Sequence, residues 1–207
     1  MRAVIGIACL GLLACEPASA GDQTYALTVS RHPSVRNFSD SEINQILRKA
    51  SAVMHAAGCP VTFTLDGHVG TFSSASVPNN VVSLGDLDKV HSEPANVKIV
   101  KEIHCCAGRK NTPGTRFEGC SWPPKAGSRS IILTETGAML GNRWAHEFGH
   151  RMGLQHIKND STALMTGSGV TTAATKVTTT ECKCFLNEGS CTLPTQPQPA
   201  AQDRCPR

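Results

Sequence analysis

The chain has 207 residues, of which 40% are hydrophobic and 17% charged, and its formal net charge is +4 at pH 7. This length fits one domain, and the low charged fraction favours an exported protein over a cytosolic helical one. The modest charge, without a dense basic run, gives no basis for nucleic-acid binding. Beyond the N-terminus no segment is long and apolar enough to span a bilayer, so we expect no transmembrane helix in the mature chain.

The first 20 residues are typical of a signal peptide. A positively charged start precedes an apolar run over 3–14, which is too short to span a bilayer, and small residues follow it. Ala18-Ser19-Ala20 fits a signal-peptidase site, so we expect cleavage after residue 20. In the alternative, 1–14 is a lipoprotein signal, and Cys15 becomes a lipid-anchored first residue. The protein is therefore expected outside the cytoplasm, either secreted or anchored to a membrane.

Strands and helices alternate in the expected order of elements. An alternating β-rich pattern predicts a strand over 24–32, and an amphipathic segment capped by Ser39 or Ser41 predicts a helix that stops at Gly58. Further patterns predict strands over 59–67, within 79–86 and 96–106, and over 129–135, with a loop over 107–130 and a helix over 138–152. This order defines an α+β domain over 21–193, followed by a Pro/Gln-rich tail over 194–207.

Eight cysteines remain beyond the signal region: Cys59, Cys105, Cys106, Cys120, Cys182, Cys184, Cys191 and Cys205. An even number in an exported chain predicts up to four disulfides. The alternative, a zinc cluster that uses Cys182 and Cys184, lacks the C-x-x-C spacing expected for such a site. Neighbours Cys105 and Cys106 are expected to bond to different partners, one of which is Cys120. The last four cysteines are expected to staple the C-terminal end together.

The predicted helix over 138–152 carries two histidines with the spacing of metal ligands. His146 and His150 are four residues apart and project from one helical face, where two imidazoles can bind one zinc ion. Glu147 follows the first of them, so its carboxylate can reach a water on the metal without replacing it. Arg143 is expected near the rim of this face.

Gly153 stands between these residues and a third histidine. If the helix continued, His156 would lie six residues beyond His150 and would point away from it. Glycine readily adopts a positive φ, the conformation with which helices often end and turn. The sequence therefore predicts a turn at Gly153 that brings His156 to the same metal. Three histidine ligands leave a fourth position open, as a catalytic zinc requires.

Residues 146–156, HEFGHRMGLQH, resemble the zinc-binding signature of the metzincin metallopeptidases. Those enzymes also have a tight Met-turn whose methionine lies beneath the metal, and Met165 in STALMTG stands where this turn is expected. The resemblance implies a twisted mixed β-sheet with two main helices in an upper lobe, about 21–153. A small irregular, disulfide-stapled lower lobe would follow over about 154–193. Ile157, next to the third histidine, assigns no subfamily.

The resemblance implies a zinc-dependent endopeptidase in which Glu147 is the general base. Peptide or protein substrates would bind extended along an edge strand of the sheet, within 96–104 or 129–135. We expect a monomer. One alternative is a zinc-binding extracytoplasmic protein without peptidase activity, against which the intact Glu147 argues. The other is a disulfide-stapled structural protein with an incidental motif, which zinc binding would exclude.

Overall fold

The first extended segment of the described chain contributes one strand to each of two sheets. The computed structural model describes residues 22–107, 109–111, 114–121, 130–167, 169–187, 191 and 204–206, so the expected signal segment lies outside them. β1 (Gln23–Leu27) pairs in parallel with β3 (Val61–Leu65), and β2 (Val29–Arg31) continues into a five-stranded sheet. Thr28 separates β1 from β2, and its backbone N–H donates to Asn96 Oδ1 at 3.0 Å. The single strand predicted over 24–32 is therefore divided at Thr28 into two strands, β1 and β2.

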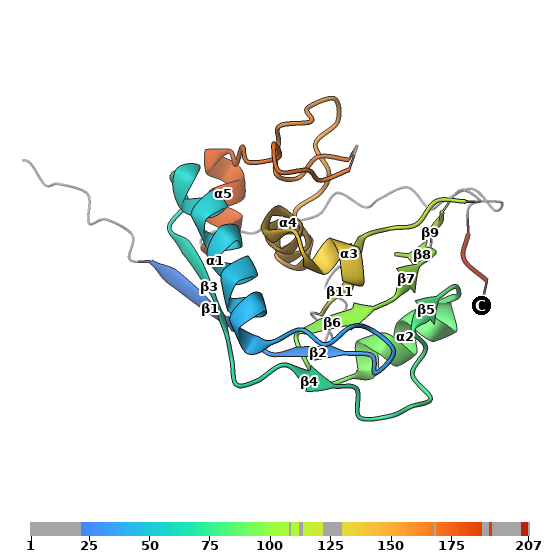
Figure 1. Ribbon diagram of the computed structural model, residues 1–207. Helices are drawn as coiled ribbons and strands as arrows, with labels where there is room; N and C mark the ends of the chain where they lie inside the picture. Colours follow the sequence, from blue (N-terminus) through green and yellow to red (C-terminus); the bar gives the residue numbers. More distant parts are fainter. Residues whose placement is uncertain are drawn as a thin grey trace, which may run out of the picture.

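The five-stranded sheet is mixed and has the order β10-β11-β6-β2-β4. Figure 1 shows β11, β6, β2 and β4 of this sheet in succession. β11 (Ile131–Thr134), β6 (Val97–Val100), β2 and β4 (Gly70–Thr71) run parallel, whereas β10 (Gly119–Ser121) runs antiparallel to β11. The main strands of the ranges 96–104 and 129–135, β6 and β11, are not edge strands of this sheet, because each is paired on two sides. The edge strand beside β11 is β10, which comes from the segment expected to be a loop.

Two short ladders lie beside this sheet. β5 (Asn80–Val81) pairs in parallel with β7 (Glu102–Ile103), and β8 (Cys105–Cys106) pairs antiparallel with β9 (Arg109–Lys110). Side chains on a strand alternate between its two faces with a period of two residues. A strand of only two residues therefore shows no repeated pattern in the sequence. Together with the helices described below, these strands confirm the α+β class predicted from the sequence.

Helix α1 (Asp40–Ala56) lies within the predicted range and begins with a capping box. The Ser39 hydroxyl accepts from the Glu42 N–H, and the Glu42 carboxylate accepts from the Ser39 N–H at 2.8 Å. The helix ends before Gly58, whose φ is +74°. Its buried stripe packs against β3 and α4 and consists of Ile43, Ile46, Leu47, Ala50 and Met54.

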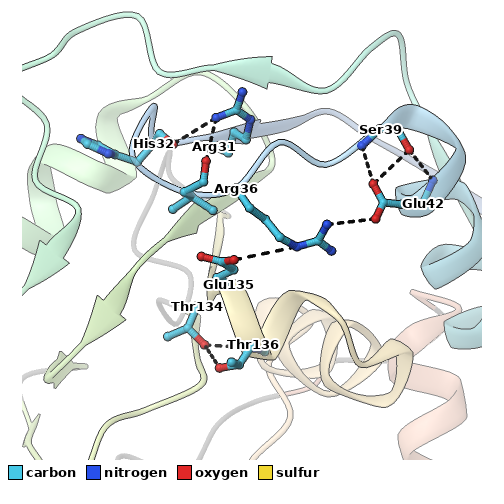
Figure 2. Close-up of polar contacts among 10 residues, drawn as sticks. Arg31, His32, Arg36, Ser39, Glu42, Thr134, Glu135 and Thr136 are labelled. Atoms are coloured by element: carbon cyan, nitrogen blue, oxygen red, sulfur yellow. Dashed lines mark hydrogen bonds and ion pairs between the residues drawn. The ribbon is translucent and has the colours of Figure 1, made fainter.

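Arg36 joins the starts of two helices, as Figure 2 shows. Its Nη1 donates to Glu42 Oε1 at 2.9 Å, and its Nε lies 3.9 Å from Glu135 Oε1. Glu42 is in the first turn of α1, and Glu135 begins α3 (Glu135–Ala138). Acidic side chains are favourable at helix N-termini. The shared guanidinium therefore ties α3, which precedes the histidine-bearing helix, to the start of α1.

The helix predicted over 138–152 corresponds to α4, and only its expected first residue, Ala138, belongs to the preceding short helix α3. α3 ends at Ala138, and α4 (Gly141–Arg151) begins after a short turn. The Trp144 indole N–H donates to the Ala138 carbonyl at 2.8 Å and closes this turn. A Cβ at Gly141 would lie only 2.8 Å from Ala50 N, so the glycine allows α4 to approach α1 closely. Trp144 and Phe148 are buried in the core between these elements.

Besides the short α3, two helices were not predicted from the sequence. α2 (Leu84–Ser92) occupies part of the range expected to be a strand, and α5 (Thr179–Phe185) lies in the cysteine-rich end. Each begins with a capping box, formed by Ser83 with Asp86 and by Thr178 with Glu181. These S/T-x-x-D/E spacings are visible in the sequence and could have identified both helices.

The structure pairs the eight cysteines as Cys59–Cys182, Cys105–Cys205, Cys106–Cys120 and Cys184–Cys191. Cys105 and Cys106 have different partners, one of which is Cys120, as expected. The expectation that the last four cysteines join one another is wrong for two of them. Cys182 and Cys205 instead bond to cysteines more than 95 residues earlier, at separations of 123 and 100. The disulfides thus attach the C-terminal part to the sheet region, and they fit an extracytoplasmic location.

Across the part of the chain that the structure describes, no helix is long and apolar enough to cross a membrane.

His91, on α2, is a buried titratable group that affects stability. Its Nδ1 contacts the Ser130 hydroxyl, and Lys98 Nζ donates to its backbone carbonyl at 3.3 Å. Burial, with a smaller contribution from the Lys98 charge, lowers the pKa of His91 from 6.5 to about 4. The unfolded chain therefore binds more protons than the folded chain as the pH falls from 6.5 to 4. The contribution of neutral His91 to the free energy of unfolding is fully present above pH 6.5 and is lost as the pH falls from 6.5 to 4.

We predict that His91→Asn, which keeps a polar group near Ser130, makes the free energy of unfolding less sensitive to acid. Urea unfolding at pH 7 and pH 4 measures the difference. The wild type should lose about 3 kcal/mol more than the variant, since each unit of pKa shift corresponds to 1.36 kcal/mol. Equal losses in both proteins would contradict the prediction.

Candidate metal centre

Helix α4 holds the first two histidines on one face. His146 is buried and His150 is half-buried, and their Nε2 atoms lie 3.0 Å apart. The four-residue spacing alone explains why both rings leave the helix in the same direction. The opposite stripe of α4, with Trp144 and Phe148, is buried in the core. One helix therefore presents an imidazole pair on one side and packs on the other.

The chain leaves this helix at Gly153 and brings in the third histidine. α4 ends at Arg151, and Gly153 has a φ of +99°. A side chain there would be strained in that conformation, and its Cβ would lie 2.7 Å from the Cys191 carbonyl oxygen. After the turn, His156 Nε2 lies 3.0 Å from His150 Nε2 and 3.3 Å from His146 Nε2. The turn places three ring nitrogens around one point.

Backbone carbonyls determine which ring nitrogen is free to bind. His146 Nδ1 lies 2.7 Å from the Leu164 carbonyl oxygen, and His150 Nδ1 lies 2.8 Å from that of Leu154. A carbonyl oxygen can only accept, so each Nδ1 carries the hydrogen and each Nε2 keeps its lone pair in the neutral ring. Carbonyl acceptors of this kind commonly orient histidines that bind metals.

Burial also keeps these imidazoles neutral. It is the largest cause of the lowered pKa at His146 and His150. His156 is exposed as a whole, but its ring lies against the other two imidazoles, and this partial desolvation lowers its pKa to about 4. Nearby positive charge, from Arg143 for all three rings, lowers the pKa values further. Neutral imidazoles are the form that binds metal ions.

The three nitrogens fit a zinc-type ion. Tetrahedral ligands about 2.0–2.1 Å from zinc would lie about 3.3 Å from one another, close to the observed 3.0, 3.0 and 3.3 Å. Three lone pairs this close together repel one another unless a cation lies between them. Among the described residues, these histidines are the one group of His, Cys, Asp and Glu that could hold a metal ion. A three-histidine set leaves a coordination position for another ligand.

Met165 lies beneath α4, close to the histidines. The residue is fully buried, and a Cβ at Gly149 would lie 2.5 Å from its sulfur. Its carbonyl accepts from the Ile157 N–H at 2.7 Å, which ties the segment around Met165 to the residue after His156. The preceding Leu164 supplies the carbonyl that orients His146. This segment therefore supports the histidine cluster from below.

Glu147 lies beside the cluster but faces the edge strand. The Ser121 hydroxyl donates to its Oε2 at 2.9 Å and is also 2.8 Å from its backbone carbonyl. A Cβ at Gly119 would lie 2.2 Å from Glu147 Oε1, so only glycine leaves room for the carboxylate. Burial raises the pKa of Glu147 to about 7, against the lowering effects of Ser121 and Arg143. A carboxyl in this environment can exchange a proton near neutral pH.

The sequence did not predict the positions of three residues of the centre. Gly119 and Ser121 belong to the range expected to be a loop, where no motif marks them. Arg143 was expected near the rim, but it is 8% exposed, and its Nη2 donates to Glu118 Oε2 at 2.8 Å. Its position three residues before His146 does place it on the histidine face, and that spacing was available in the sequence.

These residues line one cavity of about 780 Å³. Its wall includes the three histidines, Glu147, β10 and the segment that follows Met165. His156 is exposed, whereas His146 and Glu147 are nearly fully buried. A solute can therefore approach the histidines from the side of His156. Volumes of this order accommodate small molecules or a few residues of a peptide.

The α+β fold is similar to that of a solved metalloproteinase structure. Metalloproteinase-II from Bacteroides fragilis matches 86% of this chain with a TM-score of 0.51 and 12% sequence identity, and this chain spans 56% of that protein's length. Archaemetzincin from Methanopyrus kandleri matches 83% of this chain and 97% of its own, with a TM-score of 0.46 and 11% identity. A scan of protein families and a search of curated proteins find no match to the sequence.

We predict that the purified protein binds one equivalent of zinc and that His150→Ala loses it. Elemental analysis after dialysis against a weak chelator measures the stoichiometry. The matched control is His55→Ala, because His55 is an exposed histidine on α1 outside the cluster. Zinc bound equally by wild type and His150→Ala would show that the metal lies elsewhere.

Proposed function

We propose that the protein is a secreted, zinc-dependent endopeptidase of the metzincin type. The observation that carries this proposal is the convergence of three neutral Nε2 atoms, 3.0–3.3 Å apart, beside a buried carboxyl in an open cavity. His146, His150 and His156 would hold the metal, and Met165 would be the methionine of the Met-turn. The HEFGHRMGLQH spacing and the metalloproteinase-like fold support the same assignment.

Glu147 would act as the general base and then as the general acid. A zinc ion held by His146, His150 and His156 would supply a water that can lose a proton near neutral pH and a Lewis acid for the scissile carbonyl. The Glu147 carboxylate takes a proton from the attacking water and delivers it to the nitrogen of the leaving amine. Its raised pKa matches this task, since a base near neutral pH can accept and then donate a proton. Ser121 holds the carboxylate in place during both steps.

The substrate would bind as an added strand along β10. This strand pairs with β11 on one side only, and Gly119 and Ser121 line the cavity beside Glu147. An extended peptide can take the free backbone groups of such an edge. Because Ser121 contacts Glu147 directly, a peptide on β10 would have its scissile bond close to the general base.

The proposed localisation follows from the N-terminus and the cysteines. We propose cleavage after residue 20, with a lipid anchor at Cys15 as the alternative, and a monomeric catalytic domain over 21–193. The upper lobe would cover about 21–153 and the lower lobe about 154–193. Four disulfides support folding in an oxidising compartment.

We predict that Glu147→Gln retains zinc but loses cleavage of peptides. Removal of a positioned general base typically lowers kcat by about 10²–10⁴-fold. Digestion of a broad peptide library, read by mass spectrometry, measures the activity. Asp88→Asn is the matched control, because Asp88 is an exposed acid on α2.

Two outcomes would contradict this proposal. If the wild-type protein binds zinc and cuts no peptide or protein, it is a zinc-binding protein without peptidase activity. If Glu147→Gln cleaves as fast as the wild type, another group is the base.

We also predict that Gly119→Ala lowers kcat by about 100-fold, a loss that a misplacement of about 1 Å can cause. The added methyl group would occupy the space of Glu147 Oε1 and displace the carboxylate. Zinc content should stay at the wild-type value, because Gly119 is not near the carbonyls that orient the histidines. Gly85→Ala is the control, since its Cβ would lie 3.8 Å from the nearest atom, Ser83 Oγ. Unchanged kcat in Gly119→Ala would show that Glu147 does not need this position.

A further inference from the structure

We propose that the cavity selects peptides with an acidic residue next to the scissile bond, and that Arg109 recognises its carboxylate. This inference rests on the proposed peptidase function and specifies its substrate class. The metal site and the general base do not account for the cationic side chains that share their cavity. The following observations show which of these side chains is available to a substrate.

Three arginines line the cavity, namely Arg109, Arg116 and Arg143, against two acidic residues, Glu118 and Glu147. Glu147 faces Ser121 and would exchange protons with the substrate rather than neutralise a cation. A divalent metal at the histidines would add further positive charge. The described wall of the cavity therefore has a positive surplus, which favours anionic groups and disfavours basic ones.

Arg143 does not supply this free charge. Its Nη2 donates to Glu118 Oε2 at 2.8 Å and to the Val170 carbonyl at 3.2 Å, and its side chain is 10% exposed. The ion pair offsets its charge, and a substrate carboxylate would have to displace Glu118. Arg143 instead fixes the segment after Met165 against β10 and α4.

Arg116 is partly offset as well. Its Nη1 lies 4.0 Å from Glu102 Oε1, and Glu102 also pairs with His104 at 3.0 Å. The guanidinium is about half exposed, so this contact is weak and screened by solvent. Arg116 adds to the positive field of the cavity but already has an acidic neighbour.

Among the three arginines of the cavity, Arg109 is the one that forms no ion pair with an acid of the described residues. Its side chain is exposed, and no acidic group of the described residues forms an ion pair with it. Arg109 and His156 line the same cavity, and both residues are exposed. A solute that enters the cavity beside His156 therefore shares it with the Arg109 guanidinium.

The backbone around Arg109 is held against the catalytic edge strand. Arg109 lies opposite Cys106 in the β8–β9 ladder, and Cys106 is bonded to Cys120 on β10. Cys120 lies between Gly119 and Ser121, the two residues that position Glu147. A disulfide thus connects the ladder that carries Arg109 to the strand on which the substrate would extend. The guanidinium can reach a residue of that peptide near the scissile bond.

A carboxylate is the substrate group that matches such a guanidinium. Arginine and carboxylate form two parallel, charge-assisted hydrogen bonds, and lysine cannot reproduce this geometry. Such a pair at an exposed arginine corresponds to at most about fivefold in affinity, the factor that 1 kcal/mol produces. Asp and Glu in a peptide supply the group, whereas their amide isosteres Asn and Gln do not.

The test compares binding and cleavage with the full-length zinc-loaded protein. A library of random decapeptides is captured on Glu147→Gln and sequenced by mass spectrometry, and the same library is digested by the wild type. We expect Asp and Glu to exceed Asn and Gln by about threefold to fivefold in the captured peptides and at one position flanking the cleaved bonds. Lys and Arg should be depleted there.

Arg109→Gln should reduce this ratio to about one in both assays, and Arg109→Lys should restore part of it. The matched control is Arg48→Gln, an exposed arginine on α1, which should leave the ratio unchanged. A ratio of about one in the wild type, or a ratio unaffected by Arg109→Gln, would overturn the inference. Capture of acidic peptides without any cleavage would instead overturn the proposed function and leave the recognition by Arg109 standing.

Discussion

The hydrogen bonds from two histidine Nδ1 atoms to backbone carbonyls are the constraint on which the centre depends. They leave the Nε2 lone pairs of His146 and His150 directed at one point, and burial keeps the rings neutral. The acceptors are the carbonyls of Leu154 and Leu164. One belongs to the turn that follows Gly153, and the other to the segment that contains Met165. The geometry of the centre is therefore set by the chain after α4 as much as by α4.

Close backbone contacts at glycines determine where α4 sits. Gly141 lets it approach α1, Gly149 accommodates the Met165 sulfur, and Gly119 on β10 accommodates the Glu147 carboxylate. A side chain at any of these positions would move the helix or a group that it carries. Disulfides also hold the elements around α4 together. Cys106–Cys120 ties β10 to the β8–β9 ladder, and Cys59–Cys182 ties α5 to the start of β3. Helix, edge strand and C-terminal segment thus form one supporting frame.

The arginines that line the cavity differ in burial and in whether an acidic side chain offsets their charge. Arg143 is buried and offset by Glu118, so it contributes mainly to the structure of the wall. Arg109 lies at the exposed side and is not offset by an acid among the described residues. A metal at the histidines would strengthen the same positive field. The described wall of the cavity therefore combines a buried, ion-paired arginine with an exposed arginine, and under the proposed function this difference gives a physical basis for choosing among substrates.

The sequence alone determined the features that depend on local spacing. Two histidines four residues apart share a helical face in any α-helix, and Gly153 permits the turn that leads to His156. The capping box at Ser39 likewise made α1 predictable, and the alternation of helices and strands made the α+β class predictable. Only the tertiary structure decided which strand is the edge, because β10 is defined by its pairing with β11 and has no alternation of its own. It also decided the partners of Cys182 and Cys205, the support of Glu147 by Gly119 and Ser121, and the burial of Arg143. Each of these depends on segments far apart in the chain coming into contact, and no local pattern records which segments meet.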